Sequence, residues 1–110
     1  MTEAEDKTAA LLRTLWEKNR PIVEERLATL ERASAAAASG GLSDDLRKEA
    51  AKAAHNLAGA LGMYGYDEGT RVAREIDALL SSDVPGVAHL AELIARLRAA
   101  VFPESGAIPG

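Results

Sequence analysis

Alanine and leucine dominate this chain at helical spacing, and this pattern constrains the fold more than any other feature. The 110 residues include 23 alanines and 14 leucines but four aromatic residues. Alanine and leucine are strong helix formers, whereas the residues that favour strands are scarce here. The length corresponds to one domain, at about 100–200 residues per domain. The sequence therefore predicts a single all-α domain.

Composition and charge exclude several classes of function. The chain has no cysteine, which excludes a disulfide scaffold, a cysteine-based zinc site and a cysteine nucleophile. Its net charge of -4 argues against broad nucleic-acid binding. The acidic N-terminus does not resemble a secretory signal, and no run of about 18 apolar residues predicts a membrane span. We therefore expect a cytoplasmic protein. The excess of arginine over lysine, 9 against 4, is typical of a GC-rich bacterial gene.

Five helical segments follow from the periodicity of apolar residues and from helix-breaking signals. Their expected limits are about 4–19, 21–38, 43–64, 67–82 and 85–102. Pro21 is expected to separate the first two segments, and Ser43 and Asp67 to cap the third and the fourth. We predict an antiparallel four-helix bundle with an additional N-terminal helix over residues 1–102, followed by a disordered tail over 103–110.

The helix expected over 43–64 has a histidine on the side opposite its apolar stripe. On a helical wheel that advances about 100° per residue, the core-facing residues lie within about 60° of Leu57. These residues are Leu46, Ala50, Ala53, Ala54, Leu57, Leu61 and Tyr64. His55 lies about 160° from Leu57 on the same wheel. The pattern therefore predicts a solvent-exposed histidine midway along this helix.

The exposed stripe around His55 carries no charged residue after the histidine. It begins at Lys48 and continues through the expected docking residues Ala51, Lys52, Ala58, Gly59 and Gly62. Each glycine inside a helix costs about 1 kcal/mol relative to alanine, so an ordinary surface helix gains nothing from it. Glycine does allow another molecule to approach closely, and we interpret the stripe as a docking surface for a partner. The alternative is that this face packs against a neighbouring helix and that His55 is a boundary residue.

The next helix, over about 67–82, offers a partner for the histidine. If the chain reverses near Gly65, residues equally distant from the turn lie level, which puts Asp77 beside His55. Asp77 could then accept a hydrogen bond from one imidazole nitrogen and leave the other as a free nucleophile. Arg74 lies toward the same flank. The alternative is that Asp77 is an ordinary surface carboxylate, which is the common case.

His89 is the other histidine of the chain, and we interpret it as a structural or surface residue. It lies on a different helix from His55, and neither histidine belongs to a Glu-x-x-His pair. That spacing is typical of metal sites built in helical bundles. The sequence therefore predicts no metal site.

The residues around His55 resemble the signature of histidine phosphotransfer (HPt) domains. That signature is His-x-Leu-x-Gly, then small residues up to a second glycine, then an acidic helix, and the run from His55 to Tyr66 reads HNLAGALGMYGY. The run is especially similar to the phosphotransfer domain of chemotaxis histidine kinases, which shares its three glycines and its two aromatic residues. The resemblance is specific over residues 52–80 and generic elsewhere.

The resemblance implies that the chain carries phosphoryl groups. His55 would accept a phosphoryl group from a receiver-domain aspartate or a histidine kinase and pass it to another receiver. Asp77 falls where the chemotaxis relative has a glutamate that hydrogen-bonds the histidine, and Arg74 falls where it has a second histidine. Many members carry a lysine three residues after the histidine, whereas this chain has Ala58. Lys52 or Arg74 is therefore expected to neutralise the phosphoryl group.

The resemblance also implies a carrier and substrate rather than an enzyme. The receiver supplies the magnesium and most of the electrostatics of phosphoryl transfer, so we expect no cofactor in this chain. The implied partners are a response-regulator receiver domain, a histidine kinase or both, and the chain itself is expected to be a monomer. The alternative function is a non-phosphorylated helical adaptor or a dimerisation module that uses the same Gly/Ala face.

Overall fold

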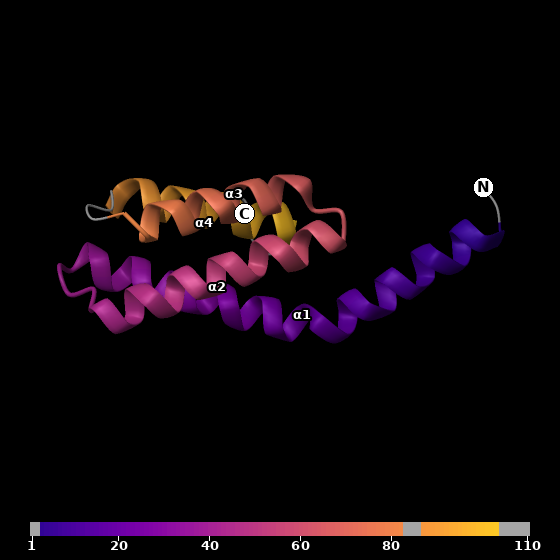
Figure 1. The fold of residues 1–110 in the computed structure, drawn as a ribbon, viewed down its shortest axis with the longest axis horizontal. Helices are drawn as coiled ribbons and strands as arrows, with labels where there is room; N and C mark the ends of the chain where they lie inside the picture. Colours follow the sequence, from indigo (N-terminus) through magenta and orange to yellow (C-terminus); the bar gives the residue numbers. More distant parts are fainter. Residues whose placement is uncertain (1–2, 83–86, 104–110) are drawn as a thin grey trace, which may run out of the picture.

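The computed structural model describes residues 3–82 and 87–103, and its regular elements are helices throughout this part of the chain. They are α1 (Glu3–Ala38), α2 (Asp44–Met63), α3 (Asp67–Leu80) and α4 (Val87–Val101). Figure 1 shows them as a bundle in which α1 and α2 lie below α3 and α4. Each helix contacts two others, in the cyclic order α1, α2, α3, α4. The predicted all-α bundle is confirmed.

The predicted break at Pro21 is wrong, because α1 continues through this residue. The additional N-terminal helix is therefore the first part of α1 rather than a separate element. Proline removes one backbone N–H and leaves the carbonyl four residues earlier without its helical partner. That carbonyl belongs to Glu17, and both Glu17 and Pro21 are exposed, so water can reach it. The helix is held on either side of the proline by Trp16 and Val23, which pack in or against the core.

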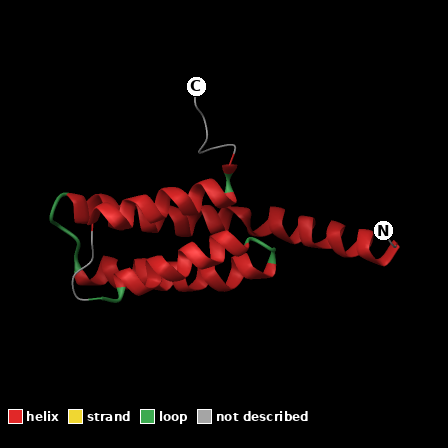
Figure 2. Cartoon of the chain, turned by 90° about the horizontal axis from the view of Figure 1, so that it is seen from above, coloured by secondary structure: helices red, strands yellow, loops and turns green. Residues whose placement is uncertain are grey.

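The first part of α1 projects beyond the bundle, as Figures 1 and 2 show from two directions. Leu11 and Leu12 lie on this projection and are 59% and 37% exposed. The bundle begins at Trp16, whose ring centroid lies 5.3 Å from that of Tyr64 and 5.9 Å from that of Phe102. This aromatic cluster fastens α1 to the ends of α2 and α4.

The core is almost entirely aliphatic. Its fully buried large side chains come from all four helices: Val23, Leu27, Leu30, Leu57, Leu61, Val72, Ile76, Leu80, Leu90, Leu93 and Leu97, with Phe102 just after α4. These residues recur three and four positions apart, which is the spacing of one helix face. Burial of such side chains contributes about 1.5–3 kcal/mol each relative to exposure, so this core orients every helix.

Local signals set the ends of α2 and α3. The Ser43 hydroxyl accepts a hydrogen bond from the Leu46 N–H at 3.1 Å, so the predicted cap of α2 is confirmed. The cap position of α3 is Tyr66 rather than Asp67, and Tyr66 makes no side-chain capping bond. Gly65 has a φ of +82°, which a glycine adopts without strain and which allows the short reversal between the two helices.

Two expectations fall partly outside the described residues. The expected start of the last helix near Pro85 lies in the undescribed segment 83–86, and the expected tail lies in 104–110 except for Pro103. No helix among the described residues is both long and apolar enough to cross a membrane.

Candidate functional site

His55 and Asp77 face each other across the hairpin formed by α2 and α3. The Nδ1 atom of His55 lies 3.5 Å from the Oδ2 atom of Asp77. The His55 side chain is 77% exposed, whereas the Asp77 side chain is 32% exposed. One imidazole nitrogen is therefore beside a carboxylate, and the rest of the ring is open to a partner in solution.

The amphipathic pattern of α2 places His55 on the outside. Ala50, Ala53, Ala54, Leu57 and Leu61 are buried on the opposite side of the helix. Because burial of these side chains fixes the rotation of α2, His55 has to point away from the core. The short turn at Gly65 then aligns α3 with α2, which brings Asp77 level with the histidine.

The carboxylate of Glu75, two residues before Asp77 on α3, pairs with an arginine instead of the histidine. Its Oε1 atom lies 3.2 Å from the Nη1 atom of Arg71, one helical turn earlier. Asp77 instead has its Oδ1 atom 3.5 Å from the hydroxyl of Ser81. The contact between Asp77 and Ser81 was not predicted from the sequence. The two residues are four positions apart on one helix, which indicates that their side chains share a face.

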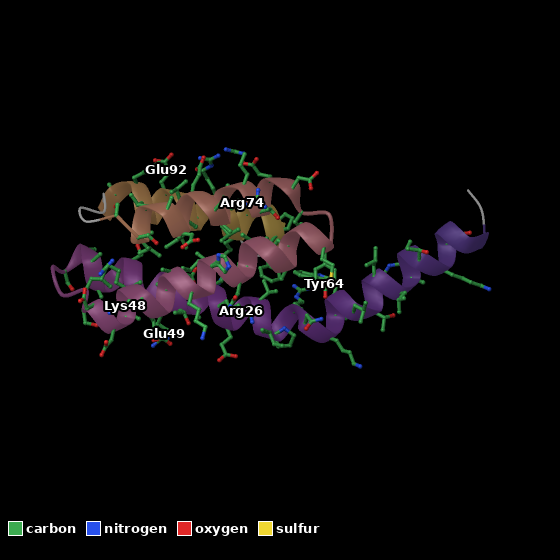
Figure 3. All side chains as sticks on the ribbon, viewed as in Figure 1. Arg26, Lys48, Glu49, Tyr64, Arg74 and Glu92 are labelled. Carbon is green, nitrogen blue, oxygen red and sulfur yellow. The ribbon has the colours of Figure 1, made fainter. Side chains whose placement is uncertain are left out.

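The two cations predicted to neutralise a phosphoryl group lie in different grooves. Lys52 lines the groove between α1 and α2, together with Arg26 of α1. Arg74 lines the groove between α2 and α3, together with Gly62. Figure 3 shows Arg26 and Arg74 on α1 and α3 respectively, at opposite sides of α2 in this view. None of the contacts within the described residues joins Lys52 or Arg74 to His55.

The predicted docking residues divide into exposed and buried positions. Gly59 is exposed, and a Cβ atom added to it would meet no other atom within 4 Å. Gly62 is also exposed, and a Cβ there would lie 3.4 Å from the Thr70 hydroxyl of α3. Lys52 is exposed, and Ala51 is half-buried against the core. The two glycines leave the surface of α2 beyond His55 without side chains at positions 59 and 62.

The predicted exposure of Ala58 is wrong, because its exposed fraction is 8%. The backbone carbonyl of Ala58 accepts a hydrogen bond from the Thr70 hydroxyl at 3.3 Å, so this position faces α3. A helical wheel with one core direction underestimates burial here, because α2 packs against α1 on one flank and α3 on the other. Ala58 is a helix-packing residue.

The remaining histidine and the acidic residues do not form a metal centre in the described part of the chain. His89 is exposed on α4. No group of three or more histidine, cysteine, aspartate or glutamate side chains among the described residues could hold a metal ion.

Comparison with known families agrees with this geometry. The family model of the Hpt domain matches residues 10–101, which is most of the chain. The protein therefore belongs to the Hpt domain family, whose members take part in histidine-containing phosphotransfer within phosphorelays, and the predicted family is confirmed. Comparisons with curated proteins and with solved structures find no significant match.

Proposed function

We propose that this protein is a phosphorelay carrier and that His55 is its phosphoryl acceptor. The observation that carries the proposal is an imidazole that is 77% exposed with its Nδ1 atom 3.5 Å from the carboxylate of Asp77. Asp77 accepts the Nδ1–H hydrogen bond and fixes the tautomer, which leaves the Nε2 lone pair free to attack phosphorus. The Hpt family match supports the same chemistry.

The transfer step exchanges one bond to phosphorus for another. The Nε2 atom of His55 forms the new N–P bond as the P–O bond to the aspartyl carboxylate of the receiver breaks. The receiver aspartate leaves as a carboxylate, and the reverse reaction charges the next receiver. Such transfer depends on in-line placement and on neutralisation of the phosphoryl oxygens. The magnesium ion comes from the receiver, so the chain itself is a carrier rather than an enzyme.

The partners are a response-regulator receiver domain, a histidine kinase or both. Ala51, Lys52, Gly59 and Gly62 lie within two helical turns of His55 on α2, and we assign them to partner docking. The side chains of Lys52 and Arg74 are long enough to swing from their grooves toward a phosphoryl group held between the two molecules. We further propose that the protein is a cytoplasmic monomer of bacterial origin, similar in function to the phosphotransfer domain of chemotaxis histidine kinases.

Labelling of the histidine tests the proposal directly. The wild type, His55→Gln and His89→Gln are incubated with phosphoramidate, a small donor of phosphoryl groups, and separately with a receiver domain charged by acetyl phosphate. We expect acid-labile phosphate on the wild type and on His89→Gln, and none on His55→Gln. Labelling of His55→Gln at the wild-type level would contradict the assignment, and an unlabelled wild type would favour the adaptor function.

The role of Asp77 is tested by a matched pair on the same helix. Asp77→Asn should slow phosphorylation of His55, because an amide supports the Nδ1–H tautomer less well than a carboxylate does. Glu75→Gln removes an equal charge from the carboxylate that pairs with Arg71, and it should leave the rate near that of the wild type. If Glu75→Gln had the larger effect, Asp77 would lose its assigned role.

A further inference from the structure

The carboxylate of Asp77 lies between two side chains, one on each oxygen. Its Oδ2 atom lies 3.5 Å from Nδ1 of His55, and its Oδ1 atom lies 3.5 Å from the hydroxyl of Ser81, which donates to it. The three side chains thus form a continuous series from the end of α3 to the exposed histidine on α2.

Ser81 is held in place by the way α3 ends. It is the C-terminal cap of this helix, and its backbone N–H donates to the carbonyl of Asp77 at 3.0 Å. This backbone bond keeps Ser81 one turn beyond Asp77, on the same side of the helix. Rotation about a single side-chain torsion therefore brings the Ser81 hydroxyl to Oδ1 of Asp77.

The Asp77 carboxylate needs such a restraint. Rotation about the terminal torsion of aspartate is broad and roughly two-fold, so the carboxylate plane is poorly fixed by its own rotamer. About a third of the side chain is exposed, at 32%, so water competes for both oxygens. A donor that occupies Oδ1 leaves Oδ2 as the acceptor that faces the imidazole.

We propose that Ser81 is a positioning residue for the phosphoryl acceptor. Its hydroxyl orients the Asp77 carboxylate, the carboxylate holds the Nδ1–H of His55, and Nε2 stays directed toward the partner. This inference rests on the proposed function of His55. Ser81 acts through Asp77 and touches no reacting atom.

The neighbouring serine provides a matched control. The Ser82 hydroxyl donates to the carbonyl of Leu79 at 2.7 Å rather than to Asp77. Loss of either hydroxyl removes one exposed side-chain hydrogen bond from the end of α3. Only loss of the Ser81 hydroxyl should change the tautomer ratio of His55.

The experiment measures the tautomers of His55 by ¹⁵N NMR in alkaline buffer, where imidazoles are neutral. The samples are the full chain as wild type, Ser81→Ala, Ser81→Thr and Ser82→Ala, and the rate of labelling by phosphoramidate is measured on each. We expect Ser81→Ala to lower the ratio of the Nδ1–H to the Nε2–H tautomer and the labelling rate by about two- to fivefold, the size expected for one exposed hydrogen bond. Ser81→Thr should restore both values, and Ser82→Ala should leave both at the wild-type level.

The outcomes separate this inference from the proposed function. A tautomer ratio that is equal in the wild type and Ser81→Ala, or one that Ser82→Ala changes as much, would overturn the role of Ser81 even if His55 is labelled normally. A wild type that is never labelled, with a tautomer ratio that depends on Ser81, would overturn the proposed function and keep the positioning role.

Discussion

Gly59 on α2 and Gly69 on α3 belong to the two helices of one hairpin, yet their surroundings are opposite. A Cβ atom added to Gly59 would meet nothing within 4 Å. A Cβ atom added to Gly69 would lie 3.1 Å from the Cδ1 atom of Leu61 and 3.3 Å from the Cγ2 atom of Val101. Gly69 is buried, whereas Gly59 is exposed one turn after His55.

The contrast separates two uses of the same residue type. A glycine inside a helix costs about 1 kcal/mol of stability relative to alanine. At Gly69 the close approach of α3 to Leu61 and Val101 offsets this cost, because a side chain there would hold the helices apart. At Gly59 no packing within the described chain uses the missing side chain. We propose that Gly59 instead leaves room for a partner beside His55.

The largest expected effect is on the packed side of the hairpin. Gly69→Leu should lower the free energy of unfolding by about 1–3 kcal/mol, because the added side chain overpacks the contact with Leu61 and Val101. Thermal unfolding followed by circular dichroism measures the effect, with Gly59→Leu as the control on the open side. Equal melting temperatures for Gly69→Leu and Gly59→Leu would contradict the difference in packing between the two glycines.

The second prediction concerns the open side. Gly59→Arg should reduce phosphoryl transfer from a charged receiver at least about tenfold, a difference of about 1.4 kcal/mol, because the side chain blocks close approach to His55. The same exchange should raise stability by a few tenths to about 1 kcal/mol through helix propensity. Transfer kinetics and thermal unfolding are measured on one preparation. An unfolded Gly59→Arg variant would identify Gly59 as a packing residue.

The smallest effect on stability is expected from loss of the charge of Glu68, the residue before Gly69. A hydrogen bond from Arg71 at 2.6 Å lowers the pKa of the Glu68 carboxyl below its ordinary value, and Arg96 of α4 lowers it further. The stabilising contribution of Glu68 is therefore complete above the ordinary glutamate pKa of about 4.3 and is lost as the pH falls through the lower folded-state value.

Glu68→Gln should accordingly lower the melting temperature slightly at pH 7 and leave it nearly unchanged in strong acid. The effect should be well below that of Gly69→Leu, since exposed ion pairs contribute little to stability. Melting curves of the wild type and the variant across the acidic range provide the measurement. A loss as large at low pH as at neutral pH would mean that the charge of Glu68 is not the cause.

The exposed position of His55 could be predicted because it depends on the spacing of residues within one hairpin. The apolar stripe centred on Leu57 orients α2, and a count of residues from Gly65 brings Asp77 level with the histidine. Ala58 was not predictable from the same wheel, because its burial depends on the Thr70 contact from α3. Ser81 was missed for a related reason, since its hydroxyl matters only once Asp77 is known to face His55.

The sequence by itself determined the all-α class, the HPt family, the N-terminal cap of α2, the turn that follows this helix, and the side of α2 on which His55 lies. These features depend on helix periodicity and on residues within a few positions of one another. The tertiary structure decided that α1 continues through Pro21, that Ala58 is buried and Gly59 open, and that Lys52 and Arg74 lie in separate grooves. Each of these depends on which helices flank a given residue, and contacts between helices can outweigh a local cost of about 3 kcal/mol such as that of a proline.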